Sequence, residues 1–114
     1  MTDKHKVLMI LVNLISNARY AMESVPQGHR LLVLTLDTLV EGRLRVAVTD
    51  NGVGIAEDML TCIFQHGFTT REGGHGFGLH ASALAAQELG GSLVAQSEGP
   101  GRGATFILEL PYQS

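Results

Sequence analysis

Three groups of residues in this chain have types and spacings that suit a flat, charged ligand. The first is the run Asp50-Asn51-Gly52-Val53-Gly54-Ile55, which directly follows an apolar stretch. A carboxylate at the end of a strand can accept a hydrogen bond from an exocyclic amine, and glycines let a flat ring lie against bare backbone. Asp and Asn-Gly are also strong turn formers, so a plain hairpin turn explains the run equally well.

The second group is a pair of asparagines, Asn13 and Asn17, four residues apart. On a helix this spacing places both side chains on one face. Ile10, Leu14 and Ala21 flank them, so we expect this face to be partly buried, and a buried amide needs hydrogen-bond partners. Because an amide oxygen suits Mg²⁺, Asn17 is a candidate metal ligand. The alternative is a pair of asparagines that face solvent.

The third group is the glycine-rich run from Gly74 to Leu79, which opens a helical pattern. Exposed backbone N–H groups and the positive end of a helix dipole suit a polyphosphate. A flexible loop before a helix is the alternative. Gly76 to Ala81 also fits the dinucleotide-binding fingerprint, with Glu98 near the usual place of the ribose acid. We reject that reading because the fingerprint must follow a strand, and here it follows a polar loop.

Weaker signals lie elsewhere in the chain. Gly103-Ala104-Thr105 begins the last expected strand, where small residues would let a base approach and the Thr105 hydroxyl could bond to it. The foot of a hairpin is the simpler explanation. His66, His75 and His80 lack the spacing of metal ligands, so loop or surface roles are expected for them.

Hydrophobic periodicity and turn residues predict the elements that position these groups. The expected helices are 4–23, 56–64 and 78–89, the last one stopped by Gly90-Gly91, and the expected strands are 31–36, 44–49, 92–97 and 104–110. The apolar stripe expected to be buried on the first helix consists of Leu8, Leu11, Val12, Ile15, Ala18 and Met22. This order predicts an α+β fold, a two-layer α/β sandwich with a mixed sheet and helices on one face.

Composition limits the classes of protein. The 114 residues suffice for one domain, and a net charge of -3 from 8 basic and 11 acidic residues argues against a nucleic-acid partner. Cys62 is the single cysteine, so an internal disulfide is impossible and a reducing, cytoplasmic location is expected. No apolar stretch reaches the roughly 18 residues of a membrane span, although a longer parent could still be membrane-anchored.

In order along the chain, the motifs resemble those of the ATP-binding domain shared by gyrase, heat-shock chaperones, histidine kinases and MutL (the Bergerat fold). The resemblance covers about residues 3–111 and rests on 11–18 (N box), 50–55 (G1 box), 63–70 (F box), 74–79 (G2 box) and 103–106 (last glycine motif). The residue sequences of Phe68-Thr69-Thr70 and of the G2 box are similar to those of sensor histidine kinases of bacterial two-component systems.

The resemblance implies a role for each matching residue. Asp50 would bind the adenine amine, Asn17 would ligate Mg²⁺, and Asn13 and Arg71 would act at the phosphates. The remaining nucleotide-binding positions would be Gly52, Gly54, Ile55, Phe64, Thr70, Gly74, Gly76, Gly78, Leu79 and Thr105. Residues 65–76 would form a mobile ATP lid, which we expect to be disordered when the site is empty.

One position separates the branches of the superfamily. Members that hydrolyse ATP carry an acid four residues before the metal-binding asparagine, whereas this chain has Asn13, and an amide is no general base. The resemblance therefore implies phosphoryl transfer to a histidine of another domain, by positioning and charge neutralisation. A non-catalytic ATP sensor and a water-hydrolysing ATPase remain the alternatives.

The resemblance also has gaps. The family strand before the N box and the dimerisation domain with the phosphoacceptor histidine are not found in residues 1–114, and position 20 is Tyr where many relatives have a basic residue. We therefore expect a single, monomeric domain excised from a longer kinase. Its expected partners are its own dimerisation domain and a cognate response regulator.

Overall fold

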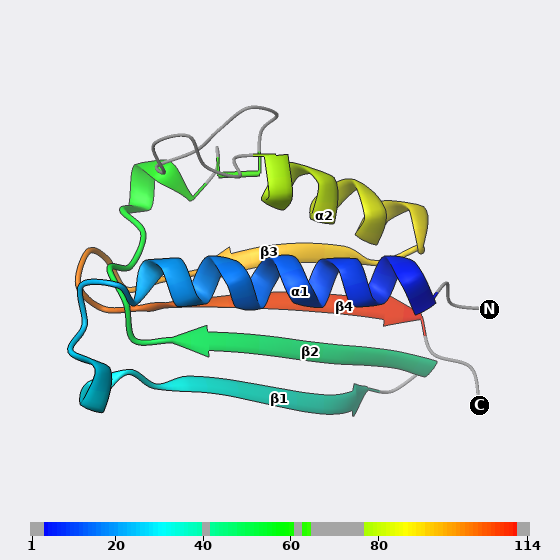
Figure 1. Ribbon diagram of the computed structural model, residues 1–114. Helices are drawn as coiled ribbons and strands as arrows, with labels where there is room; N and C mark the ends of the chain where they lie inside the picture. The colour runs from blue at the N-terminus through cyan, green and yellow to red at the C-terminus, as the bar shows by residue number, and fades with distance from the viewer. Residues whose placement is uncertain (1–3, 40–41, 61–62, 65–76, 112–114) are drawn as a thin grey trace.

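The structure is a computed structural model, and it describes residues 4–39, 42–60, 63–64 and 77–111. Its elements, in chain order, are α1 (Lys4–Ala21), the 3₁₀ turn η1 (Gln27–His29), β1 (Leu32–Leu39), β2 (Arg43–Asp50), the 3₁₀ turn η3 (Glu57–Met59), α2 (Phe77–Glu88), β3 (Ser92–Gln96) and β4 (Ala104–Pro111). Figure 1 shows the strands as one layer with α1 and α2 packed beside it. The predicted α+β fold is confirmed.

The four described strands form one sheet in the order β1-β2-β4-β3. All three pairings are antiparallel. The sequence had suggested a mixed sheet, and for the described strands that prediction is wrong. For two of the pairings the reason is the short chain between the partners: β1 and β2 are consecutive, as are β3 and β4. A short turn can join only antiparallel neighbours, because a parallel pair needs a crossover of a dozen or more residues.

The core lies between one face of the sheet and the two helices. Side chains alternate along β4, and Phe106, Leu108 and Leu110 on its inward face are buried. The other buried residues of this cluster are Ile10, Leu14, Ala18, Val48, Ile63, Ala85, Ala86, Leu93 and Ala104. Since they come from both helices and three strands, this one cluster fixes the helices against the sheet.

The buried face of α1 differs from the predicted stripe. Leu8 and Val12 are 60% and 56% exposed, whereas Ile10 and Leu14 are fully buried. Apolar residues occupy every position from 7 to 12, so the sequence marks no single apolar face there. The buried side is the one that packs against α2 and β2. Tertiary packing therefore decides the orientation of this helix.

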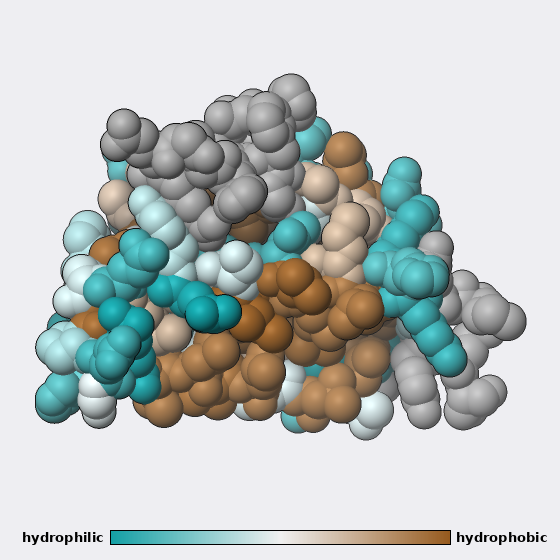
Figure 2. Space-filling model, viewed as in Figure 1, coloured by the Kyte–Doolittle hydropathy of each residue, from teal (hydrophilic) through white to brown (hydrophobic). Residues whose placement is uncertain are grey.

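An apolar surface remains exposed on α1 and β1. It consists of Leu8 and Val12 together with Leu34 and Leu36, which are 53% and 67% exposed. Leu34 pairs with Val48 and Leu36 with Val46, so both leucines lie on the helix-facing side of the sheet. Figure 2 shows these elements as a continuous brown band. We call these four residues the apolar band.

Element boundaries shift by a few residues from the predicted ones. α1 ends at Ala21, and within residues 56–60 only Glu57–Met59 is helical. The predicted stop of α2 is confirmed: Gly90 has φ of 82°, and the Gly91 N–H donates to the Ala86 carbonyl at 2.8 Å. Neither described helix has the length and apolarity that a membrane crossing requires.

Candidate functional site

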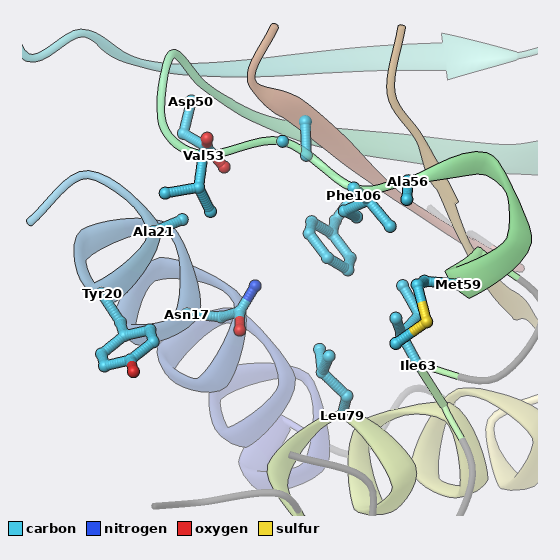
Figure 3. A pocket seen from close by; sticks show the side chains of 13 residues that line it. Asn17, Tyr20, Ala21, Asp50, Val53, Ala56, Met59, Ile63, Leu79 and Phe106 are labelled. Atoms are coloured by element: carbon cyan, nitrogen blue, oxygen red, sulfur yellow. The ribbon is translucent and has the colours of Figure 1, made fainter. Parts of the chain in front are cut away.

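A cavity of about 270 Å³ opens where α1, the turn after β2, η3 and α2 meet the start of β4. Most of its lining is apolar, and it consists of Asn17, Tyr20, Ala21, Asp50, Val53, Gly54, Ile55, Ala56, Met59, Ile63, Leu79, Ala104 and Phe106. In Figure 3 Asp50, Asn17, Leu79 and Met59 surround the ring of Phe106. The structure thus gathers Asn17, Asp50, Gly54, Ile55 and Leu79 of the sequence-predicted residues around one pocket.

Asp50 is the polar anchor of this pocket. It ends β2 and is only 4% exposed. Its Oδ1 accepts the Gly52 N–H at 2.8 Å, whereas its buried Oδ2 has no hydrogen-bond partner among the described residues. Burial raises the pKa of Asp50, against the opposing effect of the Gly52 and Ala104 N–H groups. A buried acceptor without a partner is costly, so Oδ2 marks the place for a donor of the ligand.

The turn after Asp50 is fixed to the end of α1. The Val53 N–H donates to the Ala21 carbonyl at 3.0 Å. A Cβ at Gly52 would lie 2.3 Å from that same carbonyl oxygen, so a side chain cannot fit there. Glycine at this position lets the turn pack directly on the helix. The contact brings the carboxylate of Asp50 to the same pocket as Asn17 on α1.

The same turn is held from its other side by the loop before β4. Gly54 and Gly103 have φ of 73° and 71°, the left-handed region that favours glycine. A Cβ at Gly103 would lie 2.1 Å from the backbone oxygen of Asp50. The Gly101 N–H donates to the Val53 carbonyl at 2.7 Å. Backbone contacts therefore define the shape of this end of the pocket.

Ser97 holds backbone beside the pocket, and the sequence did not single it out. Its Oγ accepts the Ile55 N–H at 3.0 Å and the Gly99 N–H at 3.2 Å, and donates to the Gly103 carbonyl at 2.6 Å. It thereby joins the pocket residue Ile55 to the loop before β4. The available signal was a serine just before a glycine-rich turn, where a hydroxyl commonly bonds to nearby backbone.

The two asparagines of α1 occupy different environments. Asn17 lines the pocket and projects toward its centre (Figure 3). Asn13 is not among the lining residues: its Nδ2 donates to Ser82 Oγ at 3.1 Å. Ser82 lies on α2 and is fully buried. One asparagine therefore faces the pocket, while the other joins the two helices.

On the α2 side, the structure adds a contact that the sequence did not predict. His80 is half-buried, and its Nδ1 lies 3.0 Å from the Phe64 carbonyl oxygen. The expected loop or surface role of this histidine is therefore wrong. Phe64 itself supports the pocket from behind, because its ring meets Phe106 edge-on at 6.1 Å and 89°.

The sequence predicted Thr105 at the nucleotide site, but its side chain does not line the pocket. Its hydroxyl lies 3.0 Å from Thr49 Oγ, and its neighbours Ala104 and Phe106 are the residues that face the pocket. Since side chains alternate along a strand, Thr105 points to the opposite face of the sheet. Gly78 lies in the first turn of α2. Thr70, Arg71, Gly74 and Gly76, like the whole expected lid, fall outside the described residues.

Comparison with known proteins finds relatives over almost the whole chain. Residues 2–114 match the family described as histidine kinase-, DNA gyrase B- and HSP90-like ATPases. The chain is 36% identical over 111 residues to sensor protein FixL of Bradyrhizobium diazoefficiens, covering 97% of this chain and 21% of that protein. It is 35% identical over 109 residues to sensor histidine kinase ZraS of Escherichia coli, covering 96% of this chain and 22% of that protein.

Solved structures show the same fold. The nucleotide-free catalytic domain of histidine kinase ThkA matches with a TM-score of 0.82 at 27% identity, over 96% of this chain and 68% of that one. Full-length ShkA in complex with AMPPNP matches with a TM-score of 0.83 at 30% identity, over 96% of this chain and 22% of that one. The matched relatives and full-length structures are thus several times longer than this chain.

Proposed function

Because the chain belongs to the family of histidine kinase-, DNA gyrase B- and HSP90-like ATPases, we propose that it binds Mg²⁺–ATP and presents the terminal phosphoryl group to a histidine of another domain. Its similarity to sensor histidine kinases identifies it as an ATP-binding catalytic domain of that type. One observation carries the proposal: at the end of an apolar pocket, Asp50 has a buried carboxylate oxygen that no described residue meets with a hydrogen bond.

That oxygen fits the exocyclic amine of adenine. The amine is a donor, and a charged acceptor in a poorly hydrated site makes a strong hydrogen bond with it. Ile55, Met59 and Phe106 supply apolar surface for the flat base. Guanine presents a carbonyl oxygen at the corresponding position, which the carboxylate would repel. The proposed ligand is therefore an adenine nucleotide.

Asn17 is the proposed Mg²⁺ ligand. It projects into the same pocket from α1, and its amide oxygen belongs to the oxygen donors that this ion prefers. A bound Mg²⁺ ion would neutralise phosphate charge. Arg71 and the glycines before α2 stay predicted phosphate contacts.

The side chain of Asn13 favours a kinase over a water-hydrolysing ATPase. Its Nδ2 donates to Ser82, and a carboxamide cannot take a proton from water. We therefore assign Asn13 a structural role and propose no general base. The phosphoryl acceptor would come from outside residues 1–114.

A longer parent protein is part of the proposal. The chain spans 21–22% of FixL and ZraS. The apolar band of Leu8, Val12, Leu34 and Leu36 is open to a further segment or domain. We propose that the parent adds a dimerisation domain with the acceptor histidine, works in the cytoplasm and passes the phosphoryl group to a response regulator.

Titration calorimetry with AMPPNP and Mg²⁺ tests the nucleotide proposal. We expect binding to the wild type, and loss of binding in Asp50→Ala because the acceptor is removed. Gln87→Ala, an exposed change on α2, is the control and should bind like the wild type. Absence of binding to the wild type at millimolar nucleotide would overturn the proposal. If the ATP-binding parent forms no phosphohistidine, the domain is a sensor and not a kinase.

A further inference from the structure

We propose that His80 is a positioning residue of the nucleotide pocket, which ties two walls of that pocket, one on α2 and one after η3, together through one hydrogen bond. The inference rests on the proposed function, since it concerns nucleotide affinity. His80 neither lines the pocket nor contacts the proposed ligand in it. Its effect would pass entirely through the residues that it holds.

The hydrogen bond fixes the proton of the imidazole. Nδ1 of His80 lies 3.0 Å from the Phe64 carbonyl oxygen. A carbonyl oxygen only accepts, so Nδ1 must carry the hydrogen and donate it. The two residues are separated by 16 positions in the sequence, and they belong to different parts of the fold, α2 and the stretch after η3. The bond therefore joins segments that local structure does not hold together.

The immediate neighbours of both partners line the pocket. Leu79 precedes His80, and Ile63 precedes Phe64; both contribute to the cavity wall. In Figure 3 Leu79 enters from α2, and Ile63 lies on the side of η3 together with Met59. A bond between the residues directly after them sets the separation of the two walls.

A second contact carries the position of Phe64 into the pocket. Its ring meets the ring of Phe106 edge-on, with centroids 6.1 Å apart. Phe106 is 1% exposed and lies in the cavity wall. If the Phe64 backbone shifts away from α2, both Ile63 and the support of Phe106 shift with it. His80 thus acts on three lining residues at once: Leu79, Ile63 and Phe106.

This arrangement predicts an effect on affinity beyond any effect on folding. A pocket that is held at the ligand's dimensions pays less ordering entropy on binding. Without the bond, the two walls must be brought together by the nucleotide itself. For one neutral hydrogen bond the expected weakening of nucleotide binding is about 5-fold.

A pair of substitutions separates the hydrogen bond from the bulk of the ring. His80→Asn keeps an N–H donor near the place of Nδ1, whereas His80→Leu fills similar space without a donor. Gln87→Ala on the exposed side of α2 is the control. Calorimetry with AMPPNP and Mg²⁺ gives the dissociation constant at a temperature where circular dichroism shows each variant folded, and thermal melting gives stability separately.

We expect His80→Leu to raise the dissociation constant about 5-fold, His80→Asn to stay within about 2-fold of the wild type, and Gln87→Ala to leave it unchanged. Equal affinities of His80→Leu and the wild type, with only the melting temperature lowered, would show a merely structural role and overturn the inference. The same affinity loss in His80→Asn and His80→Leu would overturn it too. A wild type that binds no nucleotide would instead refute the proposed function.

Discussion

The two ends of the pocket are built in different ways. At the strand end, Asp50 is set by backbone: Gly52 packs on a carbonyl of α1, and Gly103 packs on the Asp50 carbonyl itself. At the helix end, side chains on α1 and α2 set the geometry through the Asn13–Ser82 and His80–Phe64 hydrogen bonds. Backbone contacts leave no room to adjust, whereas single side-chain bonds can be exchanged or lost. Substitutions should therefore act more strongly at the strand end.

The largest effect is expected for Gly103→Ala. The φ of 71° at Gly103 disfavours a side chain, and the new Cβ would fall 2.1 Å from the backbone carbonyl oxygen of Asp50. We expect a loss of unfolding free energy of about 3 kcal/mol or more, measured by urea denaturation. Gly101→Ala is the matched control, because it has φ of 77° but nothing within 4 Å, and should cost only about 1–2 kcal/mol. Equal losses in both variants would show that the close approach of Gly103 to the Asp50 carbonyl adds nothing to the cost.

Ser97→Ala should have an intermediate effect. It leaves the partly buried Ile55 N–H without its acceptor, which costs about 1–2 kcal/mol. Because Ile55 lines the pocket, AMPPNP affinity should fall together with stability. Ser92→Ala, at an exposed position of β3, serves as control for the loss of a hydroxyl. A normal dissociation constant in Ser97→Ala would show that the loop before β4 does not shape the pocket.

The smallest contact effect is expected from Asn13 and Ser82. A double-mutant cycle with Asn13→Ala and Ser82→Ala should give a coupling energy of about 1 kcal/mol in urea denaturation.

Asn13→Ala should leave nucleotide affinity within about 3-fold, whereas Asn17→Ala should lower Mg²⁺-dependent affinity about tenfold. If both asparagine variants lose affinity equally, the division of roles between them is wrong.

Proton binding at the strand end offers a test that changes no contact. Burial raises the pKa of Asp50 above its ordinary value of 3.8, so the folded state holds this proton more tightly than the unfolded chain does. Stability should therefore fall as pH rises from 3.8 through the raised pKa, and the penalty persists above it. Asp50→Asn lacks this titration, so its stability relative to the wild type should grow with pH. A difference that shrinks as pH rises would contradict the burial of the charge.

The contrast between the two ends also explains what the sequence could reveal. Asp50, Gly52 and Gly54 could be predicted because their run stands in order with four other motifs of the family; alone, the run fits a hairpin turn equally well. Asn13 and Asn17 were found as a pair, but spacing cannot distinguish them, since the neighbouring helix decides which one is engaged. Thr105 was expected at the pocket, but its side chain lies on the other side of the sheet. The side that a β4 residue faces depends on the register of the strand.

The same limit applies to the fold. The order of elements followed from periodicity and turn residues. The buried side of α1 did not, because Leu8 and Ile10 are equally apolar, and only contact with α2 and β2 separates them. The role expected for His80 was wrong and the bond of Ser97 to Ile55 was not predicted, since a hydrogen bond between distant segments leaves no local pattern.

The most direct test of Asp50 as the group that selects adenine is AMPPNP–Mg²⁺ binding to Asp50→Asn at neutral pH. The Asn oxygen would accept the Gly52 N–H in place of Oδ1, so the amide nitrogen would face the adenine amine, donor against donor. We expect a loss of affinity of about 100-fold, in a variant whose unfolding free energy is no lower than that of the wild type. Wild-type affinity in this variant would contradict the assignment of Asp50 as the group that selects the base.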